Sequence, residues 1–380
     1  MAFNERLALY QRVSDIRQRP LIVYVTSFRQ NASGRMGSDV IPQFAKLLKE
    51  IPPDQEDLDI LIVSQGGDPI VPWRIISMVR ERYKKIGVLL PFAAYSAATL
   101  LALGADEIVM HPFSNLGPVD PQLTHQRRLP GQPGGQEVEQ IHFGSEDLRN
   151  FLDFVRSDVG ISDQEQLAKA FELICKELGA VPIGVAKRST QLALSLSEKL
   201  LSLHLGDNSQ ARAIAEALNR SFYHHGYPLG LSEAKKIGLP VTQPPKDLEE
   251  LLWQIWQDIE EEMECNKPFN PVAFVLQDAQ VAALLDPVLQ VQIPANLPPQ
   301  VAQQVFNNIL QQVQIISVPP VNYDLFQATL ESTWSKSEYH TRGKINASRL
   351  PDMNIAVSVV QVASEWTFTR NPNDQQETII

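Results

Sequence analysis

Two short segments of this sequence could carry acyl-transfer chemistry. Gly66 and Gly67 follow a strand-like run and precede a helical pattern, and glycines at such a turn let a backbone N–H group approach a reacting oxygen. Ser96 holds the same kind of position after the next strand-like run, where a serine that begins a helix can present its hydroxyl group as a nucleophile. Each segment also has a structural interpretation, because a Gly-Gly pair can form a simple tight turn and a serine can cap a helix.

The elements around these residues follow the pattern of a parallel α/β sheet. Residues 21–27 (LIVYVTS) and 58–64 (LDILIVS) are nearly continuous apolar runs, as expected for strands that are buried on both faces. Residues 41–50 and 70–85 carry apolar side chains at helical spacing. The segment AYSAATLLALGA lies between two further strand-like runs and predicts a buried helix that begins at Ser96.

The chain length and a change in composition predict two units. Several helical patterns follow residue 145 and predict an α-rich half that covers the sheet. An amphipathic helix over residues 247–265 closes the first unit, so we expect a core domain at residues 1–266. Residues 267–380 are rich in Gln, Val, Pro and Asn, which indicates an accessory or oligomerisation region.

Charge and composition exclude several classes of function. The net charge of −11 argues against a nucleic-acid partner, because nucleic-acid binding proteins gain affinity by neutralising phosphates. The two cysteines have no neighbouring ligand pattern, so we expect neither a metal nor a cofactor. No signal peptide and no membrane-spanning run is recognisable, and a cytoplasmic location is the default expectation.

Four motifs in this sequence resemble one family of proteins. They are SQGGDP, YSAATLLALGADEIVMHP, LGPVDPQ and HGYPLGLSEAKKIGLPV, and together they span roughly residues 20–243. In this order they resemble the serine dehydrogenase proteinases, a group within the ClpP/crotonase-like superfamily that is related to signal-peptide peptidase A. The resemblance implies an α/β fold with a ClpP/crotonase-like core of repeated ββα units, an α-rich covering half and a C-terminal accessory region. It also implies assembly into a homo-oligomer.

The same resemblance assigns site residues. Ser96 matches the nucleophile of the family, and the N–H groups of Gly67 and Ala97 match its oxyanion donors, with Gly66 as the reserve candidate. No cofactor is implied.

The general base does not follow directly from the resemblance. No lysine occurs between Lys85 and Lys169, where relatives with a Ser-Lys dyad hold their base, and Asp120 stands where Clp proteases have their histidine. His225 in turn stands near the Clp acid position, which implies a reversed pair with His225 as base and Asp120 as its orienting acid. His142 and Lys187 stay open as alternative bases, and His225 and Asp120 could also simply hold their loops.

The function expected from this combination is that of a serine hydrolase, a peptidase acting on a peptide or protein substrate. Two alternatives remain at the level of sequence. A crotonase-like acyl-binding enzyme would use the same N–H groups without a nucleophile. A non-catalytic ClpP-like assembly protein would keep the scaffold and have lost the base.

Overall fold

The structure of the 380-residue chain is a computed structural model. The structure describes residues 3–128, 138–220, 222, 224–286, 298–312, 316–350 and 354–371. Parts of the predicted accessory region therefore lie outside the described residues.

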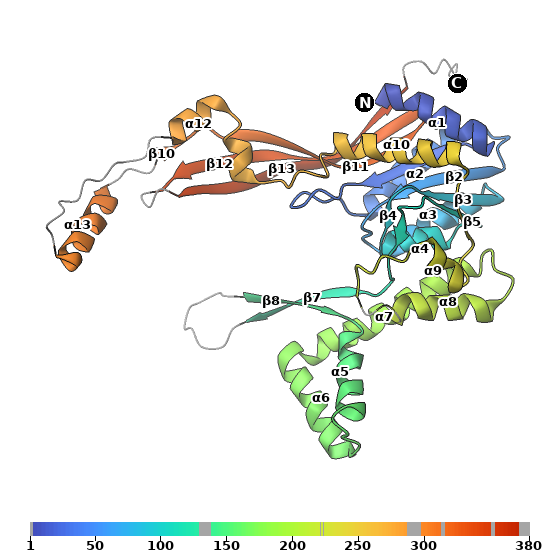
Figure 1. Cartoon of the computed structure of the whole chain (residues 1–380), viewed down its shortest axis with the longest axis horizontal. Helices are drawn as coiled ribbons and strands as arrows, with labels where there is room; N and C mark the ends of the chain where they lie inside the picture. The colour runs from blue at the N-terminus through green and yellow to red at the C-terminus, as the bar shows by residue number, and fades with distance from the viewer. Residues whose placement is uncertain are drawn as a thin grey trace.

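One mixed sheet forms the centre of the molecule (Figure 1). Its strand order is β10-β12-β11-β1-β2-β3-β5-β9, and β13 pairs with β12. The strands that form the core of the sheet run parallel: β1 (Leu21–Thr26), β2 (Asp57–Val63), β3 (Lys85–Leu90), β5 (Glu107–Met110) and β9 (Val241–Thr242). Every residue of β1 is buried, which agrees with the expectation from its continuous apolar run.

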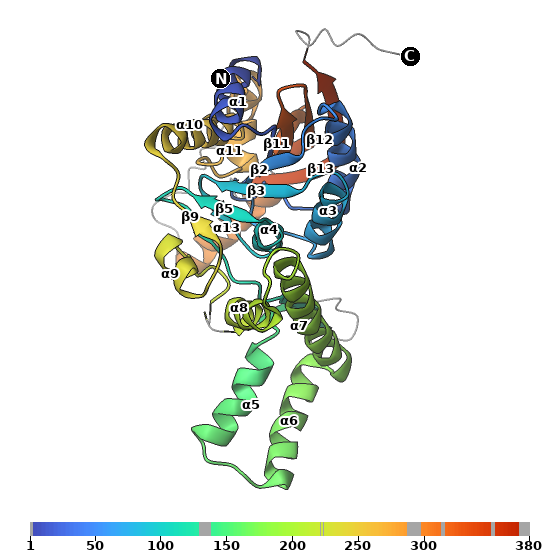
Figure 2. The same cartoon turned by 90° about the vertical axis from the view of Figure 1, so that its right-hand side faces the viewer.

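Helices cover both faces of the sheet, and each face has its own apolar core (Figure 2). One face packs against α2 (Ile41–Glu50), α3 (Ile70–Arg80), α4 (Ala97–Leu103), α7 (Ala180–Leu201) and α8 (Asn208–Arg220). The other face packs against α1 (Phe3–Arg17) and α10 (Lys246–Glu262). Alternate residues of β1 divide between the two cores, with Ile22 in the first and Val23 in the second. The predicted α/β fold class is therefore confirmed.

Two projections extend from this core (Figure 1). One consists of the hairpin of β7 (Gln122–Arg128) and β8 (Val138–Gly144) with the helices α5 (Asp147–Ser157) and α6 (Gln164–Leu178). The other is built from β11 (Val321–Ser332), β12 (Ser335–Arg349) and β13 (Ile355–Arg370), and it bears α11 (Pro271–Val275) and α12 (Ala279–Leu285). The smaller elements are β4 (Ala93–Ala94), β6 (Asn115–Leu116), α9 (Leu231–Lys236), α13 (Pro299–Gln312) and β10 (Ile316–Ser317).

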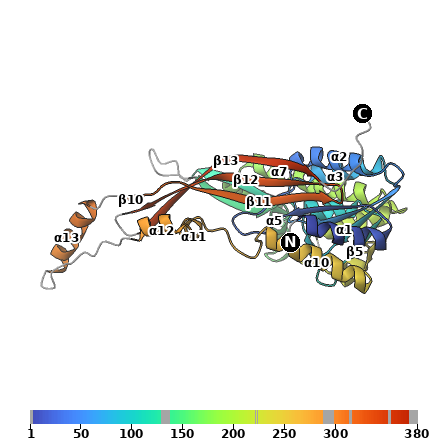
Figure 3. The ribbon, with the colours of Figure 1, turned by 90° about the horizontal axis from the view of Figure 1, so that it is seen from above.

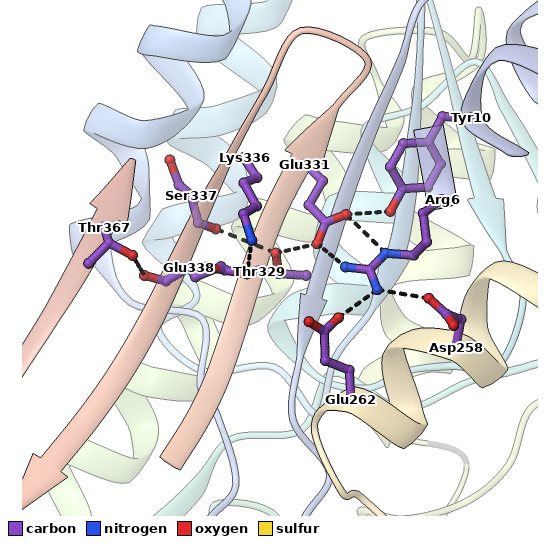
Figure 4. A network of polar contacts seen from close by, with 10 residues as sticks. All are labelled: Arg6, Tyr10, Asp258, Glu262, Thr329, Glu331, Lys336, Ser337, Glu338 and Thr367. Atoms are coloured by element: carbon purple, nitrogen blue, oxygen red, sulfur yellow. Dashed lines mark hydrogen bonds and ion pairs between the residues drawn. The ribbon is translucent and has the colours of Figure 1, made fainter. Parts of the chain in front are cut away.

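The C-terminal strands join the core sheet directly. β11 pairs antiparallel with β1, so that Ile22 lies opposite Ser332 and Thr26 opposite Ala328. A buried ion network reinforces this junction (Figure 4). Arg6 Nη2 lies 2.7 Å from Glu331 Oε1, and Arg6 Nη1 lies 2.8 Å from Asp258 Oδ2. Residues 328–332 thus extend the core sheet, while the proposed domain boundary at residue 266 stays a prediction.

Candidate active site

The turn after β2 has a backbone that only glycine fits. Gly66 has φ +92°, and a Cβ atom there would lie 2.9 Å from Ala97 N. A Cβ atom on Gly67 would lie 2.7 Å from Met36 N and would overlap the Met36 carbonyl oxygen. Any side chain at either position would therefore push apart the segments that meet at this turn.

Met36 fixes the direction of the Gly67 backbone. Met36 N donates to Gly66 O at 2.8 Å, and Asp68 N donates to Met36 O at 2.9 Å. In this parallel bridge the N–H and C=O groups of Gly67 point to the side opposite Met36. The N–H of Gly66 is already engaged, because it donates to Ser64 Oγ at 3.0 Å.

Ser96 begins α4 in a strained conformation. Its φ is +53° and its ψ is −115°, a region that residues with a Cβ atom rarely occupy. It holds the N-cap position, yet its side chain makes no capping hydrogen bond, so the interpretation of Ser96 as a helix-capping serine does not hold. Ala97 follows as the first helical residue, and its N–H has no acceptor one turn earlier in the helix.

A buried threonine anchors this turn to the next segment of the chain. Thr99 Oγ1 lies 2.8 Å from Ala94 O and 2.9 Å from Gly117 O, and Gly117 N donates back to it at 3.3 Å. The hydroxyl group therefore ties the start of α4 to the strand before it and to the loop that leads to Asp120.

His225 and Asp120 contact each other although 105 residues separate them. His225 Nδ1 lies 2.8 Å from Asp120 Oδ1, and Gln122 Nε2 donates to Asp120 Oδ2 at 2.7 Å. The loop before Asp120 is held by Asn219, whose Nδ2 donates to Val119 O at 2.8 Å. Both oxygens of the carboxylate are thus occupied and its orientation is fixed.

One cavity of about 1010 Å³ brings these groups together. Among the residues that line it are five from the predicted site: Gly66, Gly67, Ser96, Asp120 and His225. Among the described residues, no hydrogen bond joins Ser96 to the imidazole of His225. In enzymes without bound substrate, catalytic hydrogen bonds are often long and tighten only in the complex.

Part of the cavity wall is apolar. Leu100, Val119, Leu123 and Leu192 line it. Burial raises the pKa of the neighbouring Tyr95, so its phenol stays protonated at neutral pH. This part of the cavity can accept an apolar side chain.

The alternative bases lie elsewhere. Lys187 is exposed on α7 and is not among the residues that line the cavity. His142 lies on β8, where its Nδ1 is 2.9 Å from Thr124 Oγ1, and it does not line the cavity either. The structure therefore brings His225 to the cavity and leaves both alternatives outside it.

Some residues that shape the site were not predicted from the sequence. Met36 acts through its backbone, and Ser64 acts by occupying the N–H of Gly66. Neither role depends on a recognisable residue pattern. Over the part of the chain that the structure describes, no group of three or more possible metal ligands is present. No helix within those same residues is long and apolar enough to cross a membrane.

Several known proteins are similar to this chain. Two uncharacterized proteins of Methanocaldococcus jannaschii are 26% identical over 244 residues and 25% identical over 255 residues, which is 62% and 65% of this chain and 72% and 77% of theirs. A solved structure of the 1510-N membrane-bound stomatin-specific protease is 17% identical, with a TM-score of 0.35 over 61% of this chain and 83% of that one. ClpP1 from Listeria monocytogenes is 15% identical, with a TM-score of 0.30 over 63% of this chain and 99% of its own.

The match to a protein family is more informative than these single relatives. Residues 5–130 match the model of the ClpP-like SDH-type serine proteinases. This segment contains Gly67, Ser96 and Asp120, whereas His225 lies beyond it. The prediction of a serine peptidase-like hydrolase is confirmed at the level of the family. The segment over residues 5–130, which carries the glycine turn and the strained serine, is thus similar to the ClpP-like SDH-type serine proteinase family.

Proposed function

We propose that this protein is a serine peptidase that cleaves peptide bonds through an acyl-enzyme on Ser96. One observation carries the proposal. A strained serine whose side chain makes no capping hydrogen bond, a glycine turn and an Asp120–His225 pair line the same cavity. A serine whose hydroxyl makes no capping hydrogen bond is available as a nucleophile.

The base in this proposal is His225, oriented by Asp120. A carboxylate can only accept, so His225 Nδ1 donates to Asp120 and Nε2 keeps its lone pair. Nε2 takes the proton of the Ser96 hydroxyl as its oxygen attacks the carbonyl carbon, and then gives that proton to the leaving amine. A water molecule, deprotonated by the same nitrogen, then attacks the acyl carbon. The bond to Ser96 Oγ breaks, the acid product leaves, and Nε2 returns the proton to Ser96 Oγ.

The oxyanion donors are the N–H groups of Gly67 and Ala97. The N–H group of Gly67 points away from Met36, and the N–H group of Ala97 has no acceptor within the helix. Gly66 is the weaker candidate because its N–H already donates to Ser64 Oγ. Gly66 instead leaves space next to Ala97 N, because it has no side chain.

The substrate is an extended peptide that pairs with the Gly67 backbone by strand addition. The apolar wall of the cavity, with Leu100 and Leu192, favours a substrate that places an apolar side chain there. A crotonase-like acyl-binding role would use the same N–H groups, but it gives no reason for the Asp120–His225 pair. That pair favours the hydrolase.

Incubation with a peptide library of varied sequence, followed by mass spectrometry of the products, tests this function. We expect cleavage by the wild-type chain, enriched at one apolar position, and no cleavage by Ser96→Ala. Lys187→Ala serves as the control, because Lys187 lies outside the cavity and should leave cleavage unchanged. Equal cleavage by wild type and Ser96→Ala would remove Ser96 from the mechanism.

A further inference from the structure

The strand β13 is the outer edge of the sheet that extends from the core. Among the described strands it pairs with β12 alone. Figure 3 shows it as the outermost strand of this projection. Alternate residues of an edge strand direct their N–H and C=O groups outward, where another strand can pair with them.

The composition of this edge lacks the features that usually prevent such pairing. Residues 355–364 read IAVSVVQVAS, with no charged residue, no proline and no glycine. Val359 and Val360 are each 45% exposed and Val362 is 67% exposed. Natural proteins commonly protect long edge strands with charges, prolines or a covering element. The two valines exposed side by side on opposite faces show that neither face is covered at this point.

The charged residues near this edge form ion pairs within the chain itself. Glu365 Oε1 lies 3.2 Å from Arg342 Nη1, and Arg342 Nε also pairs with Asp324. Arg370 Nε lies 3.2 Å from Glu50 Oε1. Residues 355–364 of this edge therefore offer a partner backbone groups and uncharged side chains. In a chain of net charge −11, the same uncharged edge of a second copy can approach it without like-charge repulsion.

We propose that β13 pairs antiparallel with β13 of a second copy of this chain about a two-fold axis. Pairing of an edge with itself needs no separate partner protein, because a two-fold axis presents each patch to its own copy. The two projecting sheets then form one continuous sheet across the dimer.

The β-bulge in β13 defines the register. The pairing of β12 with β13 is regular from Ile355 to Gln361, and Val362 is the extra residue before Ala363. The straight segment is thus 355–361, and its central residue is Ser358. Pairing about this centre places Ser358 opposite its own copy and Val357 opposite Val359 of the other chain, so that apolar side chains face each other.

A disulfide experiment tests this register in the full-length chain, with Cys175→Ala and Cys265→Ala removing the native thiols. Ser358→Cys should form a crosslinked dimer under mild oxidation, because directly opposed residues of antiparallel strands have the Cα spacing of a disulfide. Val362→Cys is the matched control. Residues 358 and 362 are both exposed, but the two copies of residue 362 would lie about 27 Å apart in this register and should not crosslink.

A charge substitution tests the interface without a crosslinking reaction. Ser358→Lys places two ammonium groups opposite each other, so the mass measured by light scattering should fall to half that of the wild type or less. Val362→Lys, outside the paired segment, should keep the wild-type mass. A monomeric wild type, an unchanged mass for Ser358→Lys, or equal crosslinking of the two cysteine variants would each overturn the proposal.

Discussion

At the scale of single residues, the backbone of Ser96 is strained, and the proposed role of this serine as nucleophile would account for that strain. Holding a residue with a Cβ atom at φ +53° raises the free energy of the folded state by about 1–3 kcal/mol. Such strain persists where the surrounding structure enforces it. Because glycine has no Cβ atom, Ser96→Gly should raise the free energy of unfolding by about 1 kcal/mol relative to Ser96→Ala. Urea unfolding of the two variants measures the difference. Equal stability would show that the turn is unstrained.

The general base can be tested by the rate at which Ser96 reacts with an acylating probe. His225→Ala should slow acylation about 10³-fold or more, since the hydroxyl group would lose its proton acceptor. Asp120→Asn should also slow it by disturbing the imidazole orientation, and the two losses should be non-additive in the double variant. Lys187→Ala and His142→Ala are the matched controls. Full reactivity of His225→Ala with loss in either control would exclude the reversed pair.

Sequence patterns located the chemical groups better than the contacts that hold them. Ser96 and Gly67 could be predicted because each follows a strand and precedes a helix. The contact between His225 and Asp120 could be expected from the family motifs and is present, while its catalytic role stays a prediction. The bridge from Met36 to Gly67 could not be predicted, because a backbone hydrogen bond between distant segments leaves no residue pattern.

At the scale of elements, α4 depends on Thr99 for its position. Thr99→Val removes a fully buried hydroxyl and leaves the carbonyl oxygens of Ala94 and Gly117 without this donor. We expect a loss of about 1–3 kcal/mol in the free energy of unfolding, together with slower acylation of Ser96. Thr99→Ser keeps the hydroxyl group and should retain most of the wild-type reactivity. If Thr99→Val behaved like the wild type in both measurements, the anchor would be irrelevant.

The parallel strands were predictable, and the C-terminal strands were not. Continuous apolar runs identified β1 and β2 to within about one residue. Residues 335–349 contain many Ser, Lys, Glu and Arg side chains, so β12 has no clear alternation of apolar and polar residues. Its pairing comes from long-range contact with β11 and β13, which local patterns do not encode.

At the scale of the whole molecule, the N-terminal helix and the C-terminal strands stabilise each other through Arg6. The side chain is fully buried between Glu331 and Asp258. Arg6→Ala would leave these carboxylates buried without their counter-charge, and we expect a loss of about 3–5 kcal/mol in the free energy of unfolding. Lys84→Ala breaks an exposed ion pair with Glu56 and should cost under about 1 kcal/mol. Similar losses for both variants, measured by urea unfolding, would contradict a structural role for the network.

The composition change after residue 266 does not mark the start of a separate sheet. β11 lies beside β1 and continues the core, although its sequence belongs to the proposed accessory region. From sequence alone, a region rich in Gln and Pro gives no sign that part of it returns to an edge strand of the first unit. The location of the protein in the cell stays a prediction.

The central claim is that Ser96 is an activated nucleophile, and labelling with a fluorophosphonate probe tests it most directly. The probe reacts with a serine that has a functioning base and not with an ordinary surface serine. Mass spectrometry of the digested wild-type protein should place the adduct on Ser96, with no adduct in Ser96→Ala. An unlabelled Ser96 in the folded wild type, or an adduct on another serine that persists in Ser96→Ala, would contradict this account.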